Sequence, residues 1–135
     1  MAGFQSVEEF TAVVGDFLDV VRQDPRSVLA GSGFVLVFRL TDLDVEVVLD
    51  ATVTPKAGSM FDVRIGKDVE RAKATVTYEM TSDTLDRVCA GGLAPIIALA
   101  SGDVRIKGGD HVGVMRLMRA AIADGVPLYR RCRGV

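Results

Sequence analysis

Residues 74–110, ATVTYEMTSDTLDRVCAGGLAPIIALASGDVRIKGGD, are the stretch that decides the fold. Every second residue at its start is apolar, and these are Ala74, Val76, Tyr78 and Met80. The alternation predicts a strand over 72–80 with one dry and one wet face, which favours antiparallel pairing. TSDTLDRVCAGG then predicts a capped helix over about 82–90, which the two glycines end.

The rest of the stretch predicts a further helix, a strand and the start of a last helix. LAPIIALAS, 93–101, follows as a helix in which Pro95 is tolerable only in the first turn. A short strand over 103–107 lies between glycines, and Asp110 caps the last helix. The inner face of that helix carries Val114, Leu117, Met118, Ala121 and Ile122.

Upstream of this stretch, a helical pattern gives way to extended segments. Residues 6–23 predict an amphipathic helix, with Ser6 and Glu9 as a capping box. Its apolar face consists of Phe10, Val13, Val14, Phe17, Leu18 and Val21. Strands are predicted over 34–40, 45–51 and 60–65, the first two joined in a hairpin by TDLD and the third preceded by a turn at TPKAG, 54–58. This order of elements predicts an α+β fold, one sheet with helices gathered on its dry face.

The ordered motifs of residues 74–122 resemble those of the sterol carrier protein 2 domain family. The matching positions are Ser82, Asp83, Leu85, Gly92, Leu93, Pro95, Gly102, Val104, Ile106 and Gly108. Asp110 comes one residue late, because Gly109 is inserted. The resemblance implies a single five-stranded, mostly antiparallel sheet covered on one face by helices, with an apolar tunnel between the layers. It also implies binding of sterols, fatty acids, acyl-coenzyme A or other lipids, and no shared catalytic group.

The octapeptide LAPIIALA, 93–100, has no polar face. A helix of this kind needs burial on every side, either by protein or by protein on one side and a ligand cavity on another. The resemblance favours the cavity. The expected pocket walls are Phe61, Val76, Tyr78, Leu93, Ile96, Ile97, Leu99, Met115 and Met118. Phe34 and Phe38 are further large candidates, and Tyr78 offers a hydroxyl to a ligand head group.

Catalytic chemistry has little support in the sequence. His111 is the only histidine, and it lies in GGDHVG, where turn chemistry explains the glycines better than a phosphate site does. Cys89 and Ser32 lack the neighbours of a nucleophile, and no spacing of residues predicts a metal site. We therefore expect no catalytic residues and no cofactor. Catalysis by enclosing an apolar biosynthetic intermediate, alone or as an enzyme subunit, stays open as an alternative.

Composition places the chain among folded globular proteins. It has 135 residues, of which 49% are hydrophobic and 25% charged, and a net charge of −2. We expect an apolar small molecule or lipid as partner, no nucleic acid, and at most transient contact with a membrane surface. Two cysteines without a disulfide framework favour a cytoplasmic location. A dimerisation module with the apolar helix at its interface is the third interpretation.

The expected domain covers residues 1–123, and residues 124–135 form a C-terminal extension without an assigned structure. Its basic cluster, Arg130, Arg131 and Arg133, suits a solvated terminus better than a site for acidic head groups.

Overall fold

A computed structural model describes residues 4–24, 27, 29–52, 59–67, 73–109 and 111–134, without the side chains at 117, 118 and 120. The predicted turn at 54–58 and the cap at Asp110 lie outside these residues. The elements in chain order are α1 (Val7–Val21), β1 (Val35–Leu40), β2 (Val45–Asp50), β3 (Asp62–Gly66), β4 (Val76–Met80), α2 (Ser82–Cys89), α3 (Pro95–Ser101), β5 (Arg105–Gly109) and α4 (His111–Arg133).

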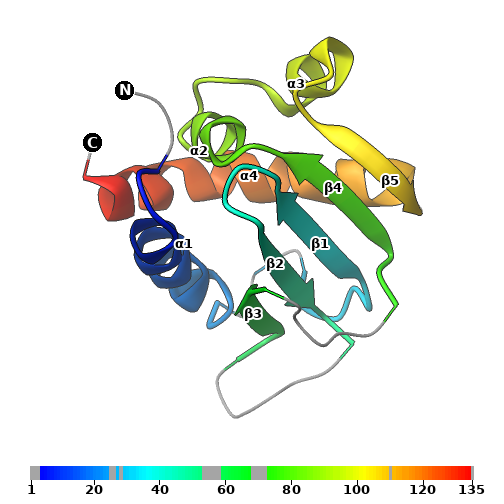
Figure 1. Cartoon of the computed structure of the whole chain (residues 1–135). Coiled ribbons are helices and arrows are strands. Elements are labelled where there is room, and N and C mark those ends of the chain that lie inside the picture. Colours follow the sequence, from blue (N-terminus) through cyan, green and yellow to red (C-terminus); the bar gives the residue numbers. More distant parts are fainter. Residues whose placement is uncertain are drawn as a thin grey trace.

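The strands form one sheet in the order β3-β2-β1-β4-β5. Three of the neighbouring pairs are antiparallel, and the central pair of β1 with β4 is parallel. Helix α4 runs behind the sheet and packs against α1 and α2, while α3 lies by the edge strand β5 (Figure 1). The predicted α+β fold, with a five-stranded and mostly antiparallel sheet, is confirmed.

Helix α1 begins where the sequence predicts. The side chain of Ser6, the N-cap, accepts a hydrogen bond from the backbone N–H of Glu9 at 3.1 Å. The carboxylate of Glu9 accepts from the N–H of Gln5 at 3.0 Å, one residue before the cap. This second bond differs from the usual capping box, but it likewise holds the chain that enters the helix.

The sheet buries apolar side chains on both faces. Leu36, Leu40, Val76 and Tyr78 belong to the main core, which the helices cover. Val35, Val37 and Val48 form a second, smaller buried cluster with Ala74 packed against it. The expected division into a dry and a wet face therefore fails at this end of the sheet, because successive residues of β1 and β2 are apolar and so point to both faces.

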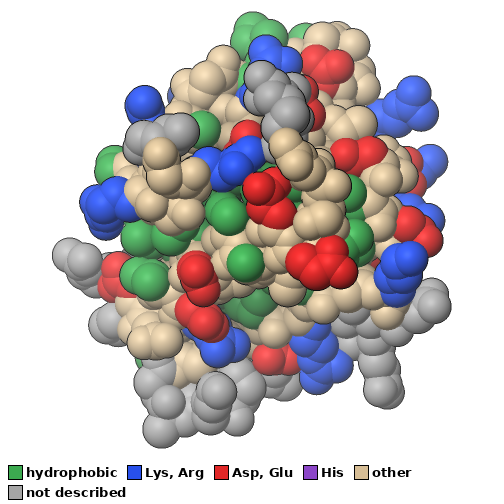
Figure 2. Space-filling view, turned by 60° about the vertical axis from the view of Figure 1, so that its left-hand side comes forward, with side chains coloured by type: hydrophobic (Ala, Val, Ile, Leu, Met, Phe, Trp, Pro, Cys, Tyr) green, Lys and Arg blue, Asp and Glu red, His purple; other side chains and the backbone are tan. Residues whose placement is uncertain are grey.

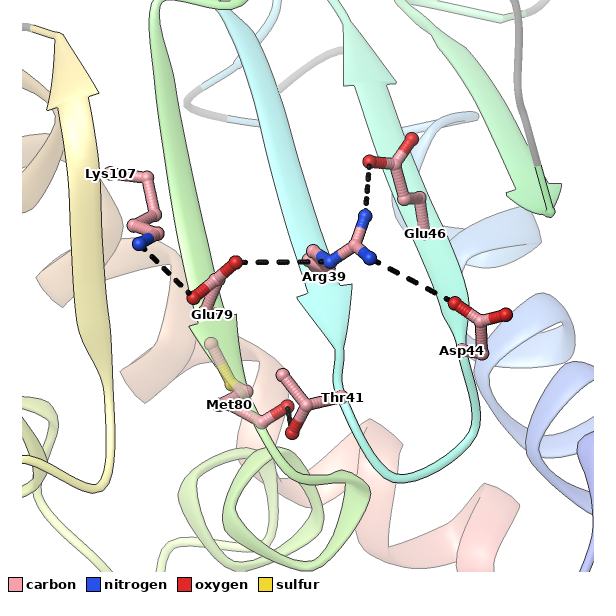
Figure 3. A network of polar contacts seen from close by, with 7 residues as sticks. All are labelled: Arg39, Thr41, Asp44, Glu46, Glu79, Met80 and Lys107. Atoms are coloured by element: carbon pink, nitrogen blue, oxygen red, sulfur yellow. Dashed lines mark hydrogen bonds and ion pairs between the residues drawn. The ribbon is translucent and has the colours of Figure 1, made fainter.

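Charged residues occupy the other end of the same outer face (Figure 3). Arg39 on β1 lies 3.8 Å from both Glu46 on β2 and Glu79 on β4, and Lys107 on β5 lies 3.7 Å from Glu79. Arg39 also lies 3.9 Å from Asp44 in the turn between β1 and β2. These long, partly exposed pairs contribute little stability individually, about 0–1 kcal/mol each. They mark the part of the sheet that faces water.

The serine of the Ser-Asp motif connects α2 to the turn between β1 and β2. The carboxylate of Asp42 accepts hydrogen bonds from the backbone N–H of Ser82 at 2.8 Å and from its hydroxyl at 2.6 Å. Thr81 caps the helix by accepting from the N–H of Thr84. Asp42 also places negative charge at the N-terminus of α2, where the helix dipole favours it.

The predicted C-terminal extension covers residues 124–135. Its residues up to Arg133 continue α4, with Pro127 inside the helix. Arg133 donates to Asp86 at 2.9 Å and lies over the ring of Phe4, 4.4 Å from its centroid. Arg130 and Arg131 are exposed. The expectation of a solvated terminus is therefore wrong for Arg133.

Figure 2 shows the side of the molecule on which α1 and the chain ends lie. Acidic and basic side chains are interspersed over this face, with small hydrophobic patches between them. Such a mixture is typical of a solvated protein surface. None of the helices in the described parts of the chain has the length and apolar character needed to cross a bilayer.

Gly109, the inserted residue, provides the first prediction. Its φ is +96°, and a Cβ there would lie 1.8 Å from the carbonyl oxygen of Thr75, beside the register shift between β4 and β5. Gly109→Ala should lower the free energy of unfolding by about 2–5 kcal/mol, since strain and overlap add. Gly102→Ala is the control, because Gly102 has a φ of +84° but open space around it, and should lose only about 1–2 kcal/mol. Chemical denaturation measures the free energy of unfolding of both variants. Equal losses in the two variants would contradict the close approach of Gly109 to the backbone of Thr75.

Candidate ligand pocket

An apolar pocket of about 150 Å³ lies between the helix-covered face of the sheet and the helices. It is partly open to solvent. Residues from α1, α2, α3 and α4, from β1, β2 and β4, and from two connecting segments line it: Val14, Phe17, Leu18, Val21, Leu29, Phe38, Val47, Leu49, Tyr78, Met80, Leu85, Val88, Cys89, Pro95, Leu99, Val104, Met115, Ala121, Ile122, Gly125 and Tyr129. None of these described lining residues is charged.

The sheet side of the pocket includes a stacked aromatic pair. The parallel register sets Phe38 opposite Tyr78, and their rings stack with centroids 5.6 Å apart and planes 19° from parallel. Met80 on β4 and Met115 on α4 add flexible side chains to the wall, and methionine adapts to apolar shapes of different outline. The pocket thus combines a stacked aromatic pair with flexible methionine side chains.

The helix side depends on one carboxylate. Asp86 on α2 accepts hydrogen bonds from the hydroxyl of Tyr129 at 2.6 Å and from Arg133 Nε at 2.9 Å, both on the last part of α4. The ring of Tyr129 meets Phe17 of α1 edge to face at 5.2 Å. A Cβ at Gly125 would lie 3.1 Å from the Phe17 ring, so the glycine lets α4 approach α1 closely. Three helices therefore meet at Tyr129.

The ionisable groups on the wall are held neutral. Burial raises the pKa of Tyr78 to about 12. Burial and the negative charge of Asp86 raise the pKa of Cys89 to about 12. Burial, together with the hydrogen bond to Asp86, also raises the pKa of Tyr129. None of these three groups is suited to exchange protons near neutral pH, where a general acid or base works best.

The structure brings some of the expected wall residues together and separates others. Tyr78, Leu99 and Met115 line the pocket. Phe61 and Val76 are buried, and Leu93 packs against the core, but the described pocket wall does not include them. The side chain of Met118 lies outside the described residues. Ligand binding by these side chains stays a prediction.

Helix α3, from the octapeptide LAPIIALA, differs from its expected placement. Pro95 and Leu99 face the pocket and Ala98 is fully buried, but Ile96 is 70% and Ile97 57% exposed. The expectation that this helix is buried on every side is therefore wrong. The helix is short and lies by the sheet edge, so only the face that carries residues 95, 98 and 99 meets protein or pocket.

The remaining candidates of the sequence do not form a site. His111 begins α4, half-buried, and its Nδ1 has no hydrogen-bond partner among the described residues. Ser32 Oγ accepts from the N–H of Phe34 in the connection before β1. No group of three or more histidine, cysteine or acidic residues in the described chain is arranged to hold a metal ion.

Sequence reasoning missed the contribution of α2 and the end of α4 to the pocket. Leu85, Val88 and Cys89 share one face of α2 by their spacing, and Ile122, Gly125 and Tyr129 do so on α4. In α4, this helical spacing of Ile122, Gly125 and Tyr129 is the sequence pattern that could have predicted their place on the pocket wall. Pro127 obscured it, because proline inside a predicted helix usually ends it.

Comparison with known proteins agrees with this architecture. No family model matches the chain, and no curated protein matches it. A sterol carrier protein domain of Helicoverpa armigera is 14% identical, with a TM-score of 0.62, over 92% of this chain and 96% of its own. A ubiquinone synthesis protein, UbiJ-SCP2, is 17% identical, with a TM-score of 0.56, over 94% and 96%. The chain thus has the sterol carrier protein 2 fold, as predicted.

A longer protein contains a similar domain. The stereoselective inverting sec-alkylsulfatase Pisa1 from Pseudomonas sp. is 26% identical over 71% of this chain, with a TM-score of 0.54. This chain covers 14% of the alkylsulfatase, so the likeness concerns a small part of that enzyme.

The exposure of α3 provides the second prediction. Ile96→Asn and Ile97→Asn should each change the free energy of unfolding by less than about 0.5 kcal/mol, as exposed substitutions do. Ala98→Asn on the same helix is the control and should lose about 2–5 kcal/mol, because Ala98 is fully buried. Thermal or urea unfolding measures all three variants. Unfolding of either isoleucine variant would show that its side chain is buried.

The raised pKa of Cys89 provides the third prediction. At pH 8 the thiolate fraction of Cys89 should be roughly 100- to 1000-fold below that of a free thiol, since each pKa unit is tenfold. Iodoacetamide should therefore modify Cys89 slowly in the folded protein, and both cysteines quickly in urea. The Cys89→Ala variant is the control, because it gives the rate at Cys132 alone. The unfolded thiol ionises first, so the contribution of Cys89 to stability is present below pH 9 and falls as the pH rises toward 12. Rapid modification of folded Cys89 would contradict the burial.

Proposed function

We propose that this protein binds an apolar ligand, a lipid or a molecule like one, in the pocket between its sheet and helices, and carries it without chemical change. The observation that carries the proposal is a pocket whose described lining residues are all uncharged and nearly all apolar. Burial of the ligand drives binding at about 0.8 kcal/mol per methylene group removed from water. The sterol carrier proteins with this fold support the same class of ligand.

The size of the pocket bears on how a long ligand is accommodated. A cavity of about 150 Å³ has room for a group of roughly the size of benzene. A longer chain or a steroid therefore extends through the open side or moves the walls apart. Met80, Met115 and Leu99 are the wall residues best suited to move, because methionine is flexible and α3 is covered on one face only.

A second candidate is service to an enzyme that acts on an apolar molecule. A ubiquinone synthesis protein with a similar fold supports it. The alkylsulfatase, of which the similar domain is a small part, supports only the association of such a domain with an enzyme, because an alkyl sulfate carries a charged group. The neutral Tyr78, Cys89 and Tyr129 offer no acid or base for such a reaction. In this candidate the chain presents or shields the substrate, and another polypeptide supplies the chemistry.

A pair of variants on α3 tests the carrier function. Leu99→Gln puts an amide on the pocket wall and should weaken binding of a fluorescent fatty acid about 5- to 100-fold, since desolvating an unpaired amide costs about 1–3 kcal/mol. Ile97→Gln, two residues away on the exposed face, should leave the affinity within about twofold. Fluorescence titration measures affinity, and circular dichroism verifies the fold.

Native mass spectrometry of the purified protein separates the two candidates further. A carrier should retain a co-purified lipid, while a substrate-presenting subunit should also form a complex with its enzyme. Absence of binding by apolar probes of every chain length would exclude both.

A further inference from the structure

Two tyrosines lie on the pocket wall, and their hydroxyl groups differ. The hydroxyl of Tyr129 donates to Asp86 at 2.6 Å. Tyr78 is only 4% exposed, and its hydroxyl is buried. This hydroxyl has no hydrogen-bond partner among the described residues. Buried polar groups in native proteins nearly always have a partner, so this exception requires an explanation.

The placement of Tyr78 indicates where a partner would lie. The residue belongs to the helix-covered face of β4, and its ring stacks on Phe38 of β1. Side chains stand roughly perpendicular to a sheet, so the hydroxyl, at the tip of the ring, projects from the sheet toward the helices that enclose the pocket. The oxygen itself is buried in the ligand-free protein, so a ligand meets it when the pocket walls move apart. Tyr78 itself is part of the pocket wall.

The residues that line the pocket determine which charge a ligand group bound to Tyr78 can carry. The described pocket-lining residues include no lysine, arginine or histidine, so an ionised carboxylate or phosphate inside would be buried without a cation. Burying such a charge unpaired is strongly unfavourable. Tyr78 has a pKa raised by burial to about 12, so it keeps its proton at neutral pH and can donate it to an uncharged oxygen.

We propose, resting on the apolar-ligand function above, that the pocket selects a neutral amphiphile, an apolar molecule with one uncharged carbonyl or hydroxyl oxygen that accepts a hydrogen bond from Tyr78. The hydrocarbon part fills the apolar pocket, and the oxygen supplies the partner that Tyr78 lacks. An anionic lipid binds through its tail alone, with its head group at the open side and no contact with Tyr78.

Three probes with ten carbon atoms each test this: decane, methyl octyl ketone and decanoate at pH 8. Their affinities for the wild type, Tyr78→Phe and Tyr129→Phe are measured by displacement of a fluorescent apolar probe. Tyr78→Phe should weaken ketone binding about 3- to 10-fold more than decane binding, the value of one net hydrogen bond. Decanoate should behave like decane. Tyr129→Phe should change all three affinities by a common factor.

Thermal unfolding of the ligand-free variants gives a second readout. Tyr78→Phe should melt at or above the wild-type temperature, because it removes an unpaired buried hydroxyl, whereas Tyr129→Phe should melt below it. Equal effects of Tyr78→Phe on ketone and decane, or a melting loss as large as that of Tyr129→Phe, would overturn the inference and leave the proposed function standing. If Tyr78→Phe weakened decanoate binding as much as ketone binding, the inference that the ligand is uncharged would also be overturned. If the wild type binds none of the three probes, the inference fails, and if it binds no apolar probe of any other chain length, the proposed function fails with it.

Discussion

The parallel pairing of β1 with β4 is the constraint on which the pocket depends. Its register sets Phe38 beside Tyr78 and Leu40 beside Met80 on the side that the helices cover. Side chains alternate along a strand, so a slip of β4 by one residue would turn Tyr78 and Met80 outward and bring Glu79 into the core. The same register therefore sets both the apolar floor of the pocket and the charged network on the opposite face.

The fold was predictable from the sequence because local signals and burial agree over most of the chain. Alternation in residues 72–80 predicted β4, and Ser6 predicted the start of α1. The octapeptide LAPIIALA is the exception, because its apolar composition predicts burial while Ile96 and Ile97 are exposed at the sheet edge. Proteins expose many apolar atoms, so composition without position does not decide burial.

The pocket was only partly predictable, since it arises from elements far apart in sequence. Tyr78 was predictable from its parity in the strand, and Leu99 from the helix without a polar face. Met115 was expected as a flexible methionine, although it is not on the inner face predicted for the last helix. The contact of Phe17 with Tyr129 depends on the way α1, α2 and α4 meet around Asp86, which no local pattern encodes. Pro127 further concealed the end of α4, where tertiary contacts outweigh the lost backbone hydrogen bond.

The bonds between Asp42 and Ser82 also bear on how the protein folds. They join positions 40 residues apart, the same separation as the hydrogen bond from the N–H of Val35 to Thr75 at the other end of the β1–β4 pair. Closing so long a segment costs chain entropy before any contact repays it, so non-local pairings of this kind slow folding. Asp42 acts at the closing point of that loop, next to the first residues of α2. A chain that forms these bonds early would already hold β1 and β4 in register while β2 and β3 add to one side and the helices cover the face.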